Sequence, residues 1–209
     1  PPLPNNLSLP TETELPSEED FSTAPVSTAD IVTLAQKALG LDEVPIEALR
    51  IHCVASEVTR VMNRMLSGEP APNEWTTAHI VGIPKKPGTT KLEEHRGICL
   101  MSCAAKLFNR LLLTRLQPVL DPYLRPEQNG FRPYRGTVAH ILALRRVIEE
   151  ARTRQSNLIV VFVDFKKAFD SVARGALPLV LRAYKVPQQL VSAIMAMYQG
   201  TRAAVATPD

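Results

Sequence analysis

The sequence predicts an α+β fold in which helices pack on a small sheet. Two observations indicate this class. Segments whose apolar residues recur at helical spacing are interleaved with a few short apolar runs typical of strands, without an internal repeat. In addition, 45% of the 209 residues are apolar, which is enough to form one good-sized core.

Five segments have the apolar spacing or the end signals of helices. Thr28 or Asp30 is the candidate cap of the first, and Gly40 is its expected end. Pro118 and Pro122 are expected to stop the third, because proline cannot continue a helix. The predicted helices cover residues 27–40, 46–68, 104–120, 137–154 and 190–200.

Three apolar segments are expected to be strands. Residues 75–90 have a partly β-branched centre followed by a loop rich in proline, glycine and lysine. Residues 158–163 read LIVVFV, and an unbroken apolar run of this kind implies that both faces of the strand are covered. Residues 202–209 have the pattern of the first strand of a hairpin, and residues 121–136 are rich in turn signals.

Residues 1–26 are predicted to be a disordered leader. The first 25 residues hold six of the 18 prolines, five acidic residues and no lysine or arginine. Such a composition cannot repay the entropy of ordering by burial. Residues 26–209 then carry 24 basic and 16 acidic side chains, a net charge of +8 that favours polyanionic partners such as nucleic acid.

We expect an intracellular protein without a membrane span. The sequence contains no apolar run of about 18 residues, and its first residues lack the pattern of a secretory signal. Three cysteines without a framework spacing also suit a reducing compartment.

Asp164 directly follows the apolar run at 158–163, so its carboxylate is expected at the end of a buried strand, facing a cleft. An ionised carboxylate is costly there without a cation or strong hydrogen bonds. In a second interpretation, Asp164 caps a helix that begins near Lys166. The spacing alone leaves both interpretations open.

Two basic segments are candidates for binding phosphate groups. Lys85 and Lys86 lie between proline and glycine, and Arg96 follows after a short acidic stretch. In such a loop, the lysine ammonium groups and the planar arginine guanidinium could together bind a phosphate. The second segment mixes basic and aromatic side chains suited to a single strand, namely Phe131, Arg132, Tyr134 and Arg135. The first pattern also fits a solvated charged turn, and the second is not specific by itself.

Six segments follow one another along the chain: KALGLDEVP at 37–45, Trp75, IPKKPG at 83–88, HRGICLMSCAAKLFNRLLLTRL at 95–116, QNGFRPYRGT at 128–137 and DFKKAFDSV at 164–172. In this order and at these distances they resemble the reverse transcriptase domain of non-long-terminal-repeat, LINE-type retrotransposons. The resemblance covers about residue 28 to the last residue. It implies that residues 27–209 form the fingers and the first part of the palm of a right-hand polymerase.

The resemblance implies roles in two-metal catalysis for the DFKKAFDSV segment. Asp164 matches the aspartate that binds the magnesium ions, which manganese could replace, and Phe165 would add its backbone carbonyl. Phe169 matches the bulky residue that packs under the sugar and rejects a 2′-hydroxyl.

The resemblance also implies the other contacts to substrates. Lys85 or Lys86, together with Arg96, match residues that grip the nucleotide triphosphate. The partners implied are an RNA template, a DNA primer and deoxynucleotide triphosphates, with action in the nucleus. The residues expected near the template are Asn129, Phe131, Arg132 and Arg135.

The sequence departs from the family pattern in three respects. Gly97 stands where the family usually has proline, so a looser loop is expected there, and Leu41 replaces another proline. The family continues beyond the position of Asp209 with an Asp-Asp hairpin that supplies further metal ligands. We therefore expect this chain alone to be inactive as a polymerase, and the alternative is a non-catalytic remnant that binds nucleic acid.

Overall fold

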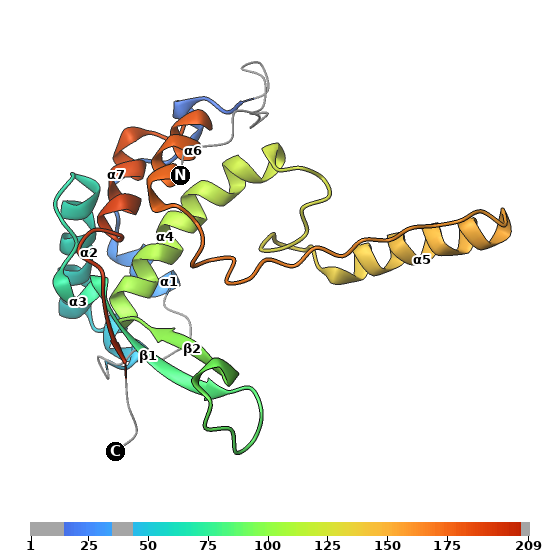
Figure 1. Cartoon of the computed structure of the whole chain (residues 1–209). Helices are drawn as coiled ribbons and strands as arrows, with labels where there is room; N and C mark the ends of the chain where they lie inside the picture. The colour runs from blue at the N-terminus through green and yellow to red at the C-terminus, as the bar shows by residue number, and fades with distance from the viewer. Residues whose placement is uncertain (1–14, 35–43, 206–209) are drawn as a thin grey trace.

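The computed structural model describes residues 15–34 and 44–205. They form a helical core, a three-stranded sheet and a long helix that projects from the body (Figure 1), which confirms the α+β class. The α-helices are α1 (Thr28–Leu34), α2 (His52–Leu66), α3 (Asn73–Thr76), α4 (Cys103–Leu120), α5 (Thr137–Thr153), α6 (Leu177–Ala183) and α7 (Gln188–Ala196). The strands are β1 (Thr77–Pro84), β2 (His95–Leu100) and β3 (Arg202–Val205). Short 3-10 helices are η2 (Glu18–Asp20), η3 (Ile46–Arg50), η4 (Leu92–Glu94), η5 (Asp121–Tyr123) and η6 (Arg174–Ala176).

The core lies where α1, α2, α4 and α7 meet. Each of these helices contributes fully buried apolar side chains, among them Ile31, Met62, Phe108 and Leu190. The ring of Trp75, on α3, packs against that of Phe108 with centroids 5.9 Å apart. Burial of these side chains removes apolar surface from water, which is the main force that stabilises the helical layer.

The segment 15–26, which composition assigns to the disordered leader, packs onto this core. Phe21 and Val26 are buried, and the amide side chain of Asn63 accepts from the backbone N–H of Val26 at 2.7 Å and donates to its carbonyl at 3.0 Å. The structure differs from the prediction for these residues, because the two apolar side chains, the Asn63 amide and a hydrogen bond from Arg115 to the Ala24 carbonyl at 2.6 Å hold the segment on the core. The residues 1–14 lie outside the described part.

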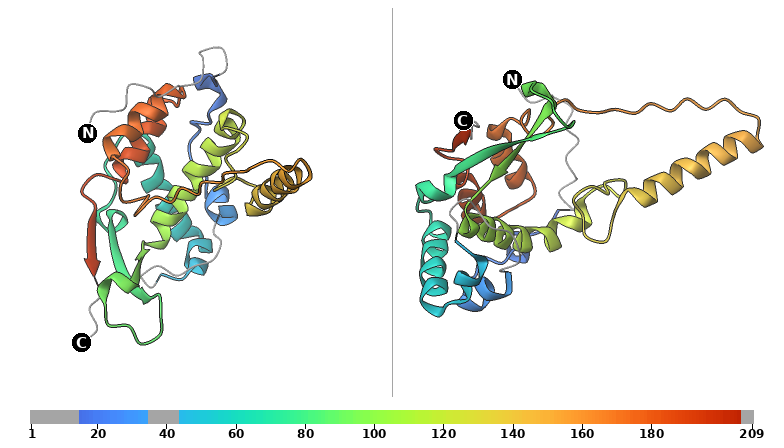
Figure 2. Two further views of the ribbon diagram at one scale, coloured as in Figure 1. Left: turned by 45° about the vertical axis from the view of Figure 1, so that its right-hand side comes forward. Right: turned by 90° about the horizontal axis from the view of Figure 1, so that it is seen from below.

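The sheet has the order β2-β1-β3, with β1 antiparallel to β2 and parallel to β3. The strand predicted within residues 75–90 is confirmed as β1. Its hairpin with β2 extends beyond the helical core (Figure 2). β3 is the strand predicted at the C-terminal end, and the rest of that prediction, residues 206–209, lies outside the described residues.

The predicted helix at 137–154 is confirmed as α5, but none of its side chains is buried. Figures 1 and 2 show it leaving the body, with the following residues returning in an extended conformation. The apolar side chains expected to face a core, including Val138, Ile141 and Leu142, are exposed. This helix therefore has an apolar face without a partner among the described residues.

The prediction that residues 158–163 form a buried strand is wrong in this structure. The segment has no assigned strand, and its apolar side chains are exposed, with Val161 at 78%. A strand requires a neighbour to complete its backbone hydrogen bonds. None of the strands in the described part of the chain lies beside this segment, because the sheet consists of β1, β2 and β3.

Two features of the helices differ from the expectations based on proline. Pro118 was expected to stop the helix but lies within α4, which continues to Leu120. At the end of the helix, the backbone N–H of Asp121 donates a hydrogen bond to the carbonyl of Gln117. The helix α6 was not predicted, although Pro178 in its first turn is a typical start signal. Among the described helices, none has the length and apolar character needed to cross a membrane.

Ser102 caps α4, and its removal is expected to cost about 1 kcal/mol of unfolding free energy. Its hydroxyl accepts a hydrogen bond from the backbone N–H of Ala105 at 3.1 Å in a nearly buried position. Urea denaturation of Ser102→Ala measures the loss. Ser67→Ala is the matched control, because the hydroxyl of Ser67 only donates to the carbonyl of Asn63 on an exposed surface. An equal loss in both variants would contradict the capping role.

Candidate functional site

The β1–β2 hairpin brings the three predicted phosphate-binding residues together. Lys85 and Lys86 follow β1 directly, and Arg96 lies on β2 opposite Ile83. All three side chains are exposed. The Lys85 ammonium donates to the backbone carbonyl of Glu93 at 2.9 Å, so the two arms of the hairpin are joined near its tip.

The expected loosening at Gly97 is not observed. Gly97 lies in the regular antiparallel ladder opposite Gly82, and a Cβ at Gly97 would lie 3.1 Å from Cγ2 of Ile80. The strand that carries Arg96 is therefore well ordered up to the tip. Lys86 adds an ion pair at 3.8 Å with Glu94, although an exposed pair of this kind stabilises little.

Arg132 was expected near the template, but the structure places it inside its own loop. Its side chain is only 4% exposed and forms an ion pair with Asp121 at 2.7 Å. The guanidinium also donates to the backbone carbonyls of Asp121, Arg125 and Gln128 at 2.8, 3.0 and 3.2 Å. With these donors occupied inside the loop, the Arg132 side chain lies away from the surface, and its contact with the template stays a prediction.

Asp121 is the ion-pair partner of Arg132, and the sequence reasoning missed it. Its carboxylate receives two hydrogen bonds from Arg132, at 2.7 and 2.9 Å. These bonds, with the nearby charges of Arg132 and Arg135, hold the pKa of the Asp121 carboxyl below its ordinary value. The sequence signal for such an internal ion pair is an aspartate at the start of a turn-rich segment, residues 121–136, that contains several arginines.

The loop held by Arg132 presents two aromatic rings to solvent. Phe131 and Tyr134 both have positive φ, 59° and 58°, which bulky residues rarely adopt. Both rings are exposed, whereas Asn129 is half-buried. Arg135 is exposed and donates to the carbonyl of Pro126 at 2.8 Å. Arg135 and Asn129 therefore remain compatible with a role at a surface ligand.

Asp164 lies in an exposed segment followed by turns over residues 166–171. No helix begins near Lys166, so the alternative interpretation of Asp164 as a helix cap is wrong. Phe165 and Phe169 are also exposed, by 74% and 78%. The carboxylate of Asp164 is thus accessible, but it does not project from a buried strand.

One contact joins two of the predicted segments. The rings of Phe131 and Phe169 meet edge to face, with centroids 5.8 Å apart and planes at 84°. The turn that carries Asp164 and the loop that carries Asn129 are therefore neighbours. Among the described residues, no hydrogen bond or ion pair joins this turn to the hairpin that carries Arg96.

The described residues do not assemble a complete metal site. Within them, no group of three or more histidine, cysteine, aspartate or glutamate side chains could hold a metal ion. Asp164 supplies the carboxylate oxygens that Mg²⁺ prefers. It can therefore be one ligand of a metal ion but cannot fill a coordination sphere.

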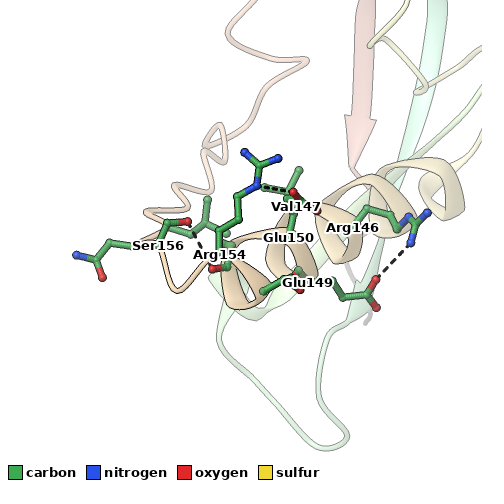
Figure 3. A pocket seen from close by; sticks show the side chains of 10 residues that line it. Arg146, Val147, Glu149, Glu150, Arg154 and Ser156 are labelled. Carbon is green, nitrogen blue, oxygen red and sulfur yellow. Dashed lines mark hydrogen bonds and ion pairs between the residues drawn. The ribbon is translucent and has the colours of Figure 1, made fainter.

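One surface depression lies away from these residues, at the C-terminal end of α5 (Figure 3). Its volume is about 710 Å³. Its charged side chains pair with neighbours along the same segment, Arg154 with Glu150 at 2.6 Å and Arg146 with Glu149 at 3.8 Å. Because neighbouring acids neutralise the arginines, we do not assign this depression to the site.

The Arg132–Asp121 pair makes stability depend on pH. The pKa of the Asp121 carboxyl is lower in the folded protein than its ordinary value of 3.8. The ionised carboxylate therefore contributes stability that is fully present above pH 3.8, and this contribution is lost as the pH falls through the folded pKa. Arg132→Gln is therefore expected to lower the thermal unfolding midpoint at pH 7 by several degrees and by less in acid. Arg125→Gln, which replaces an exposed arginine of the same loop, is the control. A deficit in Arg132→Gln that stays constant from pH 7 to pH 3 would contradict this assignment.

Comparison with known proteins identifies the family. The family model described as reverse transcriptase (RNA-dependent DNA polymerase) matches residues 83–207. This range contains the β1–β2 tip with Lys85, Lys86 and Arg96, the loop with Arg132, and Asp164.

Curated relatives support the same assignment. The Pol polyprotein of the type-1 retrotransposable element R2 of Nasonia vitripennis is 28% identical over 151 residues, which are 72% of this chain and 14% of that protein. The probable RNA-directed DNA polymerase from transposon BS of Drosophila melanogaster is 29% identical over 171 residues, 76% of this chain and 19% of that protein. The chain thus spans less than a fifth of the length of these relatives. The resemblance to the reverse transcriptase domain of non-long-terminal-repeat retrotransposons is confirmed, and the chain belongs to the reverse transcriptase (RNA-dependent DNA polymerase) family.

Proposed function

We propose that the protein containing this chain is an RNA-directed DNA polymerase of a non-long-terminal-repeat retrotransposon. The primer 3′-oxygen forms a bond to the α-phosphorus of a deoxynucleotide triphosphate, the bond from that phosphorus to the β-phosphate oxygen breaks, and pyrophosphate and the hydroxyl proton leave. The observation that supports this function is the family match over residues 83–207, which encloses both the basic hairpin and Asp164.

Reverse transcriptases use divalent metal ions, and we propose Mg²⁺, with Mn²⁺ as a substitute, at Asp164. The carboxylate of Asp164 and the backbone carbonyl of Phe165 are hard oxygen ligands of the type that Mg²⁺ prefers. When bound, the metal neutralises charge that develops on the phosphate oxygens. Two ions require more carboxylates than this turn contains, so we propose that further ligands complete the site in the full-length protein.

We propose that the β1–β2 hairpin binds the triphosphate of the incoming nucleotide. Lys85, Lys86 and Arg96 lie on one hairpin and are exposed, and Arg96 is held on a regular strand. Lysine acts as a point charge and arginine as a planar fork that can bind two phosphate oxygens. In a right-hand polymerase this hairpin would belong to the fingers, and the segment 158–172 to the palm.

We propose that Phe169 contacts the sugar and that the 128–135 loop lies near the template. Asn129, Phe131 and Arg135 are the template-side candidates, with Arg132 as the residue that fixes the loop. An RNA template and a DNA primer are the expected partners, because the charge of residues 26–209 favours polyanions. A nuclear location follows from the same proposal.

Primer extension by the full-length protein tests this function. We expect a DNA primer annealed to an RNA template to be extended with deoxynucleotides, and removal of divalent ions by EDTA to abolish extension. The absence of extension by a protein that still binds the template would overturn the proposal.

That outcome would support a second function, a non-catalytic nucleic-acid-binding protein. The exposed Asp164 and the net positive charge of residues 26–209 are the observations that favour it. RNA affinity that falls steeply as salt rises, without any extension, is its expected signature.

A further inference from the structure

Phe131 and Phe169 form an aromatic pair between two segments that are distant in sequence. Their ring centroids are 5.8 Å apart and their planes meet at 84°. This edge-to-face geometry is the one that the ring quadrupoles favour. Because both rings are largely exposed, by 88% and 78%, the contact leaves much of the Phe169 ring available to a ligand.

The loop on the Phe131 side is held firmly. Arg132 fixes it through Asp121 and three backbone carbonyls, and the side-chain amide of Gln117 donates to the Phe131 carbonyl at 3.5 Å. Phe131 has a φ of 59°, a conformation that a bulky residue keeps only when its surroundings impose it. The backbone that carries the Phe131 ring is therefore held in place by hydrogen bonds within its own loop.

The turn on the Phe169 side is held by short-range bonds. The N–H of Val172 donates to the Phe169 carbonyl at 3.4 Å, and the N–H of Ser171 donates to the Lys167 carbonyl at 3.0 Å. These bonds fix the backbone of the turn but not the direction of the Phe169 side chain. Within the described residues, the Phe169 ring meets the ring of Phe131 edge to face.

We propose that Phe131 is a positioning residue that sets sugar selectivity through Phe169. This inference rests on the proposed function, in which Phe169 packs under the sugar. A ring excludes a 2′-hydroxyl only if it cannot move aside, and Phe131 blocks movement of the Phe169 ring on one side. Removal of the Phe131 ring gives Phe169 room to retreat, so a ribonucleotide fits better while a deoxynucleotide is affected little.

The test is the ratio of kcat/KM for a deoxynucleotide to that for the matching ribonucleotide, measured in the full-length protein. In Phe131→Ala we expect this ratio to fall about 3- to 10-fold, mainly through a lower KM for the ribonucleotide. Phe131→Tyr keeps the ring and is expected to keep the ratio. Tyr134→Ala is the control, because it removes the other exposed, positive-φ ring of the same loop.

The outcomes separate this inference from the proposed function. If the wild type does not extend a primer, the proposed function fails and this inference fails with it. If the wild type extends and discriminates, but Phe131→Ala keeps the wild-type ratio, only this inference is overturned. Equal losses of selectivity in Phe131→Ala and Tyr134→Ala would also overturn it, because they would indicate a general disturbance of the loop.

A double-mutant cycle gives a readout that does not need activity. Phe131→Ala, Phe169→Ala and the double variant are compared by chemical denaturation of this chain. We expect the two single effects on the folding equilibrium to be non-additive, because each variant removes the same ring contact. Strict additivity would show that the rings do not interact and would overturn the inference.

Discussion

Asp164→Asn in the full-length protein is expected to slow primer extension on the order of a thousandfold while RNA affinity is retained. Asparagine keeps the shape of the side chain but removes the charge that would hold a divalent ion beside the reacting phosphate. A metal ion contributes several kcal/mol of transition-state stabilisation, and each ~1.4 kcal/mol is a factor of ten in rate. Single-turnover extension with a saturating nucleotide measures the chemical step directly.

The control for Asp164→Asn is Glu74→Gln, which neutralises an exposed carboxylate on α3 outside the proposed site. We expect it to extend primers at the wild-type rate. A rate for Asp164→Asn within a few-fold of the wild type would show that Asp164 is not a metal ligand. Loss of RNA binding together with extension would instead indicate a damaged fold.

Arg96→Ala is expected to lower kcat/KM for the incoming nucleotide about 10- to 100-fold, mainly by raising KM. The reason is that hydrogen bonds between charged groups are worth roughly 1.5–3 kcal/mol, and Arg96 would lose its contact with the triphosphate. Steady-state extension as a function of nucleotide concentration gives both parameters.

Two further variants sharpen the Arg96 test. Arg96→Lys retains the charge but not the fork, so it should recover only part of the loss. Arg50→Gln removes an exposed arginine of η3, away from the hairpin, and should leave KM unchanged. An unchanged KM in Arg96→Ala would remove Arg96 from the nucleotide site.

The sequence predicted the helices well where an apolar stripe meets other helices. The stripe of residues 46–68 places Met62 and Met65 in the core, and the leucines of 104–120 pack as expected, with Leu107 and Leu111 buried. Strand β1 and the basic tip were also predictable, because turn residues mark the tip and β-branched residues mark the strand. These features depend on local pattern and so can be found from sequence.

The failures concern features that depend on distant partners. The run at 158–163 has strand composition, but its state depends on whether another strand lies beside it. Arg132 has the same local pattern as a surface arginine, and only the position of Asp121 makes it an internal residue. The contact of Phe131 with Phe169 likewise exists only after two remote segments fold together.

The claim that this chain belongs to a template-directed polymerase is tested most directly by the identity of the first nucleotide added. The full-length protein is given one DNA primer on four RNA templates that differ only in the base to be copied, with all four deoxynucleotides present. The account predicts that each template directs addition of its own complement. Addition of the same nucleotide on every template, or of none, would contradict it.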